Sequence, residues 1–593
     1  MTATTGEPEL STGPAATGPL HVRWLGRVGY REAWDLQHQL HRGSADHLLL
    51  LEHAPVYTIG RSGRPDNLLI DPASVGAELV RVDRGGDITF HGPGQIVGYP
   101  ILSVAGKRGG GMADTVAYVS NVEQVIIDVL AELGLDGARL DGFPGVWLDV
   151  DSARPRKIAA IGVRLTRGRS MHGFALNLDV DLDWFANMIP CGIADKGVTS
   201  LRQEGVDAST ERVVDLLARS VAARLKPGAP IDRSDAVFKH RATDLSPFSR
   251  GMGPGQKIRP DPAAERAPHT PESPTAEPRP PEPASGVPVR LRGRLEEAGV
   301  AGGLQIDARK PPWMRVKLKT DQNYRDLRAT ARSLQLTTVC EEAGCPNIFD
   351  CWNEGTATFM LLGERCTRAC GFCLIDTRKP GPVDWEEPAR VAEAVEKLGL
   401  SFAVLTMVAR DDLEDGGAAL VAAAVAAIKD RNPGVGVEVL ISDLQGDEAS
   451  LRTVCEADPD IVNHNIETVA RLQRAVRPSA GYARSLAVLA RSKQAGMTTK
   501  SGLIVGMGER FDEVVSTLSD LAAVGVDVVT IGQYLRPTSH HLPIHRWWDP
   551  AEFEELKRIG ETELGLAHVA ASPLTRSSHH AGSIAESVSV EGS

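Results

Sequence analysis

Residues 357–373 read ATFMLLGERCTRACGFC, an apolar β-rich run followed directly by a loop with the spacing C-x3-C-x2-C. Further β-rich runs alternate with helical patterns after it, each helix opened or closed by Gly, Pro, Asp or Ser. The predicted strands are 357–362, 402–407, 435–441, 460–466, 499–505 and 526–532, and the predicted helices include 386–398, 417–430, 481–495 and 510–523. Repeated βα units predict a parallel sheet curled into a barrel, with its active site on the loops after the strands.

The thiols of Cys366, Cys370 and Cys373 can bind three corners of an iron–sulfur cubane, which leaves the fourth iron open for a small chelating ligand. A cluster of this kind is the electron donor for radical chemistry with S-adenosylmethionine. A structural zinc site is the alternative, but such a site normally closes with four ligands.

A second triplet, Cys340, Cys345 and Cys351, precedes the strand with the spacing C-x4-C-x5-C. Buried structural cysteine is the usual alternative for any single Cys. Six of the eight cysteines fall between Cys340 and Cys373, in two triplets, so two clusters are the better interpretation.

The ordered triplets, together with GERC (363–366), NHNIET (463–468), QYLRPT (533–538) and RSSHHA (576–581), resemble the lipoyl synthase family over roughly 310–582. The resemblance implies a partial (β/α) barrel of the radical S-adenosylmethionine type that inserts two sulfurs, at C6 and C8, into a protein-bound octanoyl chain. His579 stands where the family usually has Tyr, and TMVARD (406–411) replaces a slightly different run.

The resemblance also implies two [4Fe–4S] clusters, S-adenosylmethionine and an external electron donor. The reducing cluster would be held by Cys366, Cys370 and Cys373, and the auxiliary cluster, which is consumed as the sulfur source, by Cys340, Cys345, Cys351 and Ser577. Asn465 and Glu467 would meet S-adenosylmethionine; a capping or core hydrogen bond is the alternative for either residue. An electron-transfer or scaffold module without chemistry is the competing interpretation of this half.

The N-terminal half contains both predicted strands and predicted helices. The predicted strands are 47–52, 95–102, 146–150 and 158–165, and the predicted helices are 30–42, 116–133 and 210–225, which indicates an α/β domain around a mixed sheet. The run RGGDITFHGPGQ (84–95) is a candidate binding loop, because four Gly and one Pro allow close approach of backbone to a ligand. No phosphate-binding G-x4-G-K-[ST] run occurs.

Cys191 follows a Pro and precedes a Gly, and its thiol would become a nucleophile if a nearby ammonium lowered its pKa. Alone, Cys191 is more often a core residue and Lys157 a solvated strand end. Together with 84–95, KIAAIG (157–162), HGFALN (172–177) and PCGI (190–193), they resemble the lipoyl(octanoyl)transferase family over roughly 20–238.

This second resemblance implies the fold of biotin and lipoate ligases, and octanoyl transfer from acyl carrier protein to a lysine of the lipoyl domains of 2-oxoacid dehydrogenases and of the glycine cleavage H protein. Cys191 would carry the acyl thioester, and Lys157 would lower the pKa of that thiol and transfer its proton. The residues that would line the acyl site are Arg84, Gly85, Gly86, Asp87, Ile88, Thr89, Phe90, His91, Ala160, Ile161, Gly162, Gly173, Phe174 and Ala175. An ATP-dependent lipoate ligase is the alternative, and a non-enzymatic adaptor would leave these motifs unexplained.

A Pro-rich run divides the halves. The expected organisation is a tail (1–19), a transferase domain (20–238), a linker (239–290), a synthase domain (291–582) and a second tail (583–593). Within 291–582 we expect an auxiliary-cluster segment (310–355), the barrel (356–571) and the serine motif (572–582).

Charge and hydropathy limit the partners. The net charge of −12 argues against nucleic acid, and the longest apolar run, 418–428, is too short to cross a membrane, so a cytoplasmic enzyme is expected. One basic run departs from the acidic balance, comprising Arg154, Arg156, Lys157, Arg164, Arg167 and Arg169. It predicts either a solvated face or a docking patch for an acidic carrier.

Overall fold

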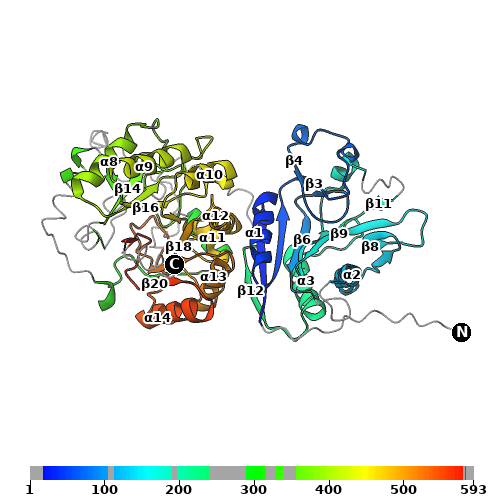
Figure 1. The fold of residues 1–593 in the computed structure, drawn as a ribbon. Helices are drawn as coiled ribbons and strands as arrows, with labels where there is room; N and C mark the ends of the chain where they lie inside the picture. The colour runs from blue at the N-terminus through cyan, green and yellow to red at the C-terminus, as the bar shows by residue number, and fades with distance from the viewer. Residues whose placement is uncertain are drawn as a thin grey trace, which may run out of the picture. The chain divides into compact units, whose positions relative to one another are not determined.

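The computed structural model describes residues 18–104, 113–189, 196–238, 289–315, 329–330, 332–334, 336–338, 347, 351, 356–578 and 581–582. The chain divides into two compact units, the first built on Met1–Lys239 and the second on most of the chain from His240 to Ser593 (Figure 1).

The N-terminal unit contains two sheets. Its strands are β1 (Leu20–Val28), β2 (Asp46–His53), β3 (Val56–Ile59), β4 (Glu78–Arg81), β5 (Ile88–His91), β6 (Gln95–Ile101), β7 (Ala138–Leu140), β8 (Phe143–Leu148), β9 (Arg156–Thr166), β10 (Arg169–Asn177), β11 (Gly197–Val198) and β12 (Ile231–Asp235). The larger sheet has the order β12-β1-β2-β6-β10-β9-β8-β7, with β11 paired to β9, and the smaller has the order β4-β3-β5. Parallel pairs such as β1–β2 and antiparallel pairs such as β9–β10 occur together, so the sheet is mixed.

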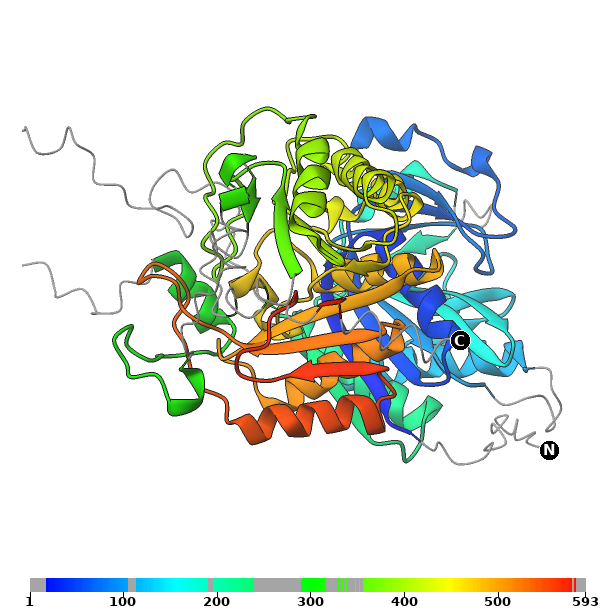
Figure 2. The same cartoon turned by 60° about the vertical axis from the view of Figure 1, so that its left-hand side comes forward.

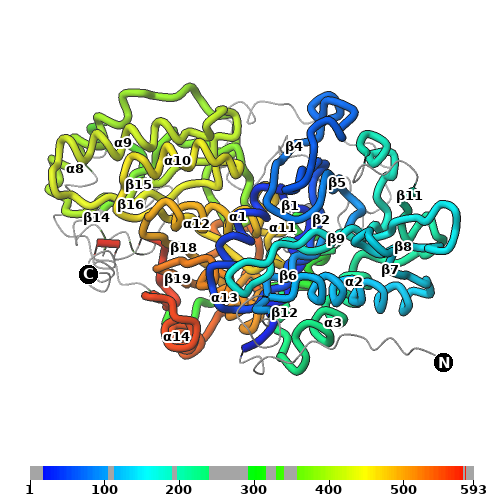
Figure 3. The backbone as a smooth tube through the Cα atoms, turned by 45° about the vertical axis from the view of Figure 1, so that its right-hand side comes forward, coloured from blue at the N-terminus to red at the C-terminus, as the bar shows by residue number. Residues whose placement is uncertain are grey.

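Helices cover this sheet, and Figure 3 follows the unit from the blue β1 to the cyan β8 and β9. They are α1 (Tyr30–Arg42), α2 (Thr115–Glu132) and α3 (Thr210–Leu225). The side chains of Asp114 and Ser209 accept backbone N–H groups at the starts of α2 and α3, which fixes where these helices begin. Apolar residues of α2 and α3 join those of the large sheet in one buried core.

The C-terminal unit is an eight-stranded sheet with the order β13-β14-β15-β16-β17-β18-β19-β20. Its strands are β13 (Thr337–Thr338), β14 (Thr356–Leu361), β15 (Phe402–Met407), β16 (Gly436–Leu440), β17 (Ile461–Asn463), β18 (Thr498–Val505), β19 (Val528–Gln533) and β20 (His568–Ala571). From β14 to β20 each strand pairs in parallel with the next in the chain. All their carboxyl ends therefore meet at one edge, where ligands bind in such folds.

The helices of this unit are α4 (Val289–Glu297), α8 (Glu387–Leu398), α9 (Ala418–Arg431), α10 (Glu448–Glu456), α11 (Gln473–Val476), α12 (Tyr482–Gln494), α13 (Phe511–Ala523) and α14 (Pro550–Arg558). In Figure 2 the strands run from green through orange to red, and the red α14 lies beside β20. Among the described residues, no helix combines the length and the apolar character needed to cross a bilayer.

The predicted fold class is confirmed in both halves, with strand and helix ends mostly within two or three residues of the prediction. Among the predicted elements two differ by three residues: β8 begins at Phe143 rather than 146, and β17 ends at Asn463 although the predicted strand extends to 466. His464 and Asn465 leave the strand there, at the edge where the loops of the site begin. The tails and most of the Pro-rich linker lie outside the described residues.

Candidate functional sites

The three-cysteine loop leaves β14 through a tight turn, in which Leu362 and Gly363 have φ angles of 68° and 88°. Backbone hydrogen bonds then fix it on both sides. Cys366 N donates to Asp376 O over 2.8 Å, and Gly371 N donates to Val476 O over 2.8 Å. The loop is thus held at the carboxyl edge of the sheet.

The segment after β19 braces the same loop. Leu542 N donates to Gly371 O over 2.9 Å, and a Cβ added at Gly371 would lie 2.7 Å from Leu542 Cδ1. His541 Nε2 donates to Cys373 O over 3.0 Å, and burial lowers the His541 pKa, which favours the neutral ring. Only glycine fits at 371 without moving Leu542.

The three cysteines are only partly exposed, and the charges of their thiols interact. Burial raises the pKa of Cys366, and it raises the pKa of Cys370 to about 12, against the opposing charge of Arg477. The Cys373 pKa is raised most, again by burial. A bound iron ion would take the place of the thiol proton and offset the raised pKa.

Among the described residues, no three His, Cys, Asp or Glu side chains converge on a single metal ion. Three thiols on one loop are the ligand set that a cubane takes, because each thiolate of a cubane binds a different iron.

Arg368, between the first two cysteines, ties the loop to its neighbouring strands. Its guanidinium donates to both carboxylate oxygens of Asp411, at 2.8 and 2.7 Å, and lies 2.6 Å from Asp443 Oδ1. Arg368 is 7% exposed and Asp443 is fully buried. These contacts orient the loop between the ends of β15 and β16. The spacing of residues in the sequence did not predict them.

Asn465 and Glu467 lie beyond the end of β17, facing this loop. Asn465 Nδ2 donates to Glu467 Oε1 over 3.1 Å, while Asn465 Oδ1 is buried with no hydrogen-bond donor among the described residues. Burial raises the Glu467 pKa, and its charge interacts with those of Cys370 and Cys373. A buried acceptor without a donor and a buried carboxylate beside the thiols fit a cofactor that brings ammonium or hydroxyl donors.

A polar contact brings the second triplet's segment to the C-terminal serine motif. Cys351 is buried, and its N–H donates to Asn347 O over 3.0 Å. The Asn347 side chain donates to Leu574 O over 2.7 Å, three residues before Ser577. Cys340 and Cys345 lie outside the described residues.

In the N-terminal unit, strand pairing joins two of the predicted acyl-site runs. Residues 160–162 of β9 lie opposite 173–175 of β10, with Gly162 paired to Gly173. A Cβ added at Gly162 would lie 3.1 Å from Arg84 Cδ and from Gly85 O. Three separate sequence runs therefore meet at one place, and glycine permits the approach.

The loop 84–87 is fixed by its own polar groups. Arg84, 7% exposed, donates to Thr58 O and Oγ1 over 2.9 and 2.8 Å. Asp87 Oδ2 accepts from Asn67 Nδ2 over 2.6 Å. Gly86 has a φ of 89°, which glycine adopts without strain.

A chain of hydrogen bonds runs from this loop to the strand of the predicted lysine. His91 Nδ1 donates to Gln95 Oε1 over 2.7 Å, and Gln95 Nε2 donates to Asn177 Oδ1 over 2.9 Å. Asn177 Nδ2 donates to Thr199 O, and Thr199 N donates to Lys157 O, both over 2.9 Å. This chain sets the position of β11 against β9.

Lys157 Nζ donates to Pro144 O over 3.0 Å and lies 4.6 Å from the centre of the Trp147 ring. Cys191 lies outside the described residues. Two residues before Cys191 in the chain, Ile189 N donates to Asn67 O over 2.8 Å. After Cys191, β11 pairs with β9 at Lys157.

Several residues predicted for the acyl site have side chains in hydrophobic clusters. Phe174 belongs to the main core and Ile161 packs against it. Ile88 and Phe90 belong to a smaller cluster, in which Phe90 stacks on Trp184 with a 4.9 Å separation of ring centres. At these positions the structure shows the side chains packed in hydrophobic clusters.

Three of the six members of the basic run are buried or ion-paired, so these three do not form a free cationic surface for docking. Arg169 is 8% exposed and donates to Ser44 O and Ser103 Oγ over 3.0 and 2.9 Å. Arg164 pairs with Asp83, and Arg156 pairs with Asp149 and Glu204. Burial and ion pairing leave these three guanidinium groups unavailable to a partner, although the sequence alone suggested a free cationic surface.

Sequence reasoning also missed a buried ion pair inside the C-terminal sheet. Lys500 Nζ lies 2.9 Å from Glu438 Oε2, both side chains are fully buried, and Asn463 Nδ2 donates to Glu438 Oε1 over 2.7 Å. The sequence did carry a signal for this pair, since each of the two strands contains a single charged residue.

Three family models match the chain. The lipoyl protein ligase A/B catalytic domain matches residues 29–222, the N-terminal domain of lipoyl synthase matches 297–345, and the radical SAM superfamily matches 360–521. A lipoyl synthase of Rubrobacter xylanophilus is 50% identical over 301 residues, covering 50% of this chain and 91% of that protein. Lipoyl synthases of Oceanobacillus iheyensis and Mycobacterium tuberculosis are each 51% identical, covering 47% of this chain and 89% of each relative.

Among solved structures, a bipartite lipoate protein ligase from Thermoplasma acidophilum aligns with a TM-score of 0.31 and 18% identity, over 36% of this chain and 87% of that one. Methylornithine synthase aligns with a TM-score of 0.31 and 16% identity, over 41% and 70%. Family models and curated relatives together show that the chain belongs to the lipoyl synthase family, that it carries a lipoyl protein ligase A/B catalytic domain before its radical SAM domain, and that it is a bifunctional enzyme of lipoate biosynthesis.

Proposed function

We propose that the chain performs two successive steps: octanoyl transfer from acyl carrier protein to a lysine of a lipoyl domain, and then insertion of two sulfurs at C6 and C8 of that octanoyl group. The observation that carries the second step is the placement of Cys366, Cys370 and Cys373 on one partly exposed loop, where the charges of Cys370 and Cys373 interact with that of Glu467. The first step supplies the substrate of the second.

In the first step, the Cys191 thiolate attacks the thioester carbonyl of octanoyl carrier protein, and the carrier thiol leaves. The amine of the target lysine then attacks the new thioester, an amide forms, and the Cys191 thiol is released. Lys157 would accept the thiol proton and return it to the leaving sulfur. The contacts of Lys157 Nζ with Pro144 O and the Trp147 ring support this role, because they favour an ammonium at that position.

The acyl chain would lie along the meeting point of 84–87, 160–162 and 173–175. Glycine at 162 and 173 lets these backbones approach closely, because an added Cβ would lie 3.1 Å from Arg84 Cδ at position 162 and 2.1 Å from Gly98 O at position 173. Thioester exchange needs no ATP. This distinguishes the proposal from ligase chemistry on a related fold.

In the second step, Cys366, Cys370 and Cys373 would hold the reducing cluster and Cys340, Cys345, Cys351 and Ser577 the auxiliary cluster. When bound, these clusters and S-adenosylmethionine supply the electron, the radical chemistry and the sulfur.

Asn465 and Glu467 would bind the polar groups of S-adenosylmethionine, with Asn465 Oδ1 accepting a hydrogen bond for which the described residues offer no donor. Arg368 and His541 would keep the cysteine loop in place.

The test uses the anaerobically reconstituted full chain with octanoyl carrier protein, apo lipoyl domain, reductant and S-adenosylmethionine, and weighs the lipoyl domain by mass spectrometry. We expect the mass of an octanoyl group first and that of two added sulfurs later, without ATP. Octanoylation that requires ATP would replace transfer with ligation, and octanoyl domain that never gains sulfur would contradict the second step.

A further inference from the structure

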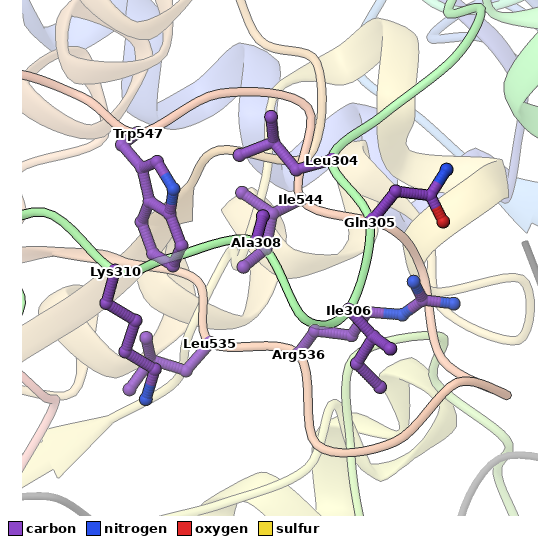
Figure 4. A pocket seen from close by; sticks show the side chains of 9 residues that line it. All are labelled: Leu304, Gln305, Ile306, Ala308, Lys310, Leu535, Arg536, Ile544 and Trp547. Carbon is purple, nitrogen blue, oxygen red and sulfur yellow. The ribbon is translucent and has the colours of Figure 1, made fainter.

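A cavity of ≈ 60 Å³ lies in the C-terminal unit between the segment 304–310 and the loop that follows β19. Its apolar walls come from Leu304, Ile306, Leu535, Ile544 and Trp547. Figure 4 shows Trp547, Leu304 and Ile544 around one end, with the polar groups of Gln305 and Arg536 toward the other.

Large apolar side chains are exposed in and just after the segment 304–310, which forms one wall of the cavity. Ile306, in its wall, is 54% exposed, and Trp313, seven residues further on, is 39% exposed. Exposed side chains of this size, close in sequence to the wall of a cavity that is part apolar and part polar, are typical of a protein-binding surface.

The same stretch is locally basic. Arg309, Lys310 and Arg315 are exposed, against the single carboxylate of Asp307. Among the described residues, no ion pair joins any of these three cations to a carboxylate, although the full sequence carries a net charge of −12. An acidic partner repelled by the chain as a whole would be attracted here.

The cavity is connected to the cysteine loop through short hydrogen bonds. Arg536, in its wall, donates from Nε to His541 O over 3.1 Å, and His541 in turn donates to Cys373 O over 3.0 Å. The next residue, Leu542, donates to Gly371 O. A protein seated at the cavity would thus contact the loop that braces the cysteines.

We infer that Ile306, Arg309, Lys310, Trp313 and Arg315, here called the 306–315 surface, dock an acidic face of the protein domain that carries the octanoyl-lysine, with one of its apolar side chains in the cavity. The inference rests on the proposed function, since it assigns the protein substrate of the sulfur-insertion step to a surface. Exposed apolar side chains flanking a cavity favour a folded protein over a nucleic acid, which would need a longer cationic track.

The experiment compares two substrates in the sulfur-insertion reaction of the full reconstituted chain: an octanoylated lipoyl domain and a short octanoyl-lysyl peptide. The variants are Arg309→Glu with Lys310→Glu, and Trp313→Ala. The matched control is Trp385→Ala, because Trp385 is 62% exposed and lies outside the 306–315 surface.

We expect the double charge reversal to raise KM for the domain about tenfold at low salt and less at high salt, while kcat and the peptide reaction stay within about twofold. Trp313→Ala should raise KM for the domain without a salt dependence, and Trp385→Ala should change neither substrate.

Equal loss with domain and peptide, or no change with the domain, would overturn the docking role. Binding of the surface to anionic vesicles or RNA, with unchanged KM for the domain, would assign it to another partner and also overturn the inference. If wild-type enzyme converts neither substrate, the proposed function fails instead, so the two failures are distinguishable.

Discussion

The side chain of Asn347 donates a hydrogen bond to the main-chain oxygen of Leu574 over 2.7 Å, across 227 residues of sequence. Asn347 is 2% exposed, and its own carbonyl accepts from Cys351 N. One buried amide therefore links the second cysteine segment to the residues that lead to Ser577.

Asn347→Leu should weaken the auxiliary cluster selectively. The variant leaves Leu574 O without its donor and releases the serine motif, so we expect reconstituted iron to fall by up to about half, with the reducing cluster retained. Iron analysis and reductive cleavage of S-adenosylmethionine measure the two separately. Full iron content in the variant would show that the contact does not support the cluster.

Cys370→Ala and Cys351→Ala should affect different reactions. Loss of Cys370 should stop reductive cleavage of S-adenosylmethionine, whereas loss of Cys351 should leave cleavage and stop sulfur insertion. The assay quantifies the cleavage products and the sulfurated lipoyl domain in the same samples. Equal loss of cleavage in both variants would indicate a single shared cluster.

Cys191→Ser should abolish octanoyl transfer without changing iron content, because a hydroxyl is far less ionised than a thiol at neutral pH. Lys157→Met should slow transfer and shift its pH optimum upward, since the thiol then lacks the neighbouring ammonium. Mass spectrometry of the acyl-enzyme and of the lipoyl domain provides both readouts. Near wild-type transfer by Cys191→Ser would exclude the covalent route.

Lys500→Met should be more destabilising than the double variant Glu438→Gln with Lys500→Met. The single change leaves the fully buried Glu438 carboxylate without its cation, at a cost of about 3–5 kcal/mol, whereas the double change removes both charges. Thermal unfolding of the three proteins provides the comparison. A double variant less stable than the single one would mean that the pair itself stabilises the sheet.

His53 should make the N-terminal unit lose stability in acid. It is fully buried, its Nδ1 donates to Val28 O over 2.9 Å, and burial lowers its pKa from 6.5 to about 4. Above pH 6.5 neither state binds the proton; between about pH 6.5 and 4 only the unfolded state does, so stability is lost as the pH falls through this window. The full loss is about 3 kcal/mol.

Chemical denaturation at pH 7 and pH 5 of wild type and His53→Gln measures this contribution. The variant should be less stable at pH 7 but lose less on acidification, since glutamine does not titrate. Equal pH dependence in the two proteins would assign the acid sensitivity to other groups.

The two cysteine triplets and the alternation of strands and helices could be predicted from sequence, because both are local. Helix and strand periodicities depend on neighbours within a few residues, and the 402–407 strand was predicted to the residue. The spacing of metal ligands on one loop is equally local, so Cys366, Cys370 and Cys373 could be identified from the sequence without knowledge of the fold.

Relationships between distant segments were decided only by the tertiary structure. The pairing of Gly162 with Gly173 depends on strand register, and the contact of Asn347 with Leu574 depends on how the end of the chain crosses β19. Arg169 is a second example. In the sequence it is one of a run of basic residues, but in the structure it is buried and donates hydrogen bonds to Ser44 and Ser103. Charge and residue type are read from the chain, whereas burial and partners exist only once segments far apart in sequence are packed together.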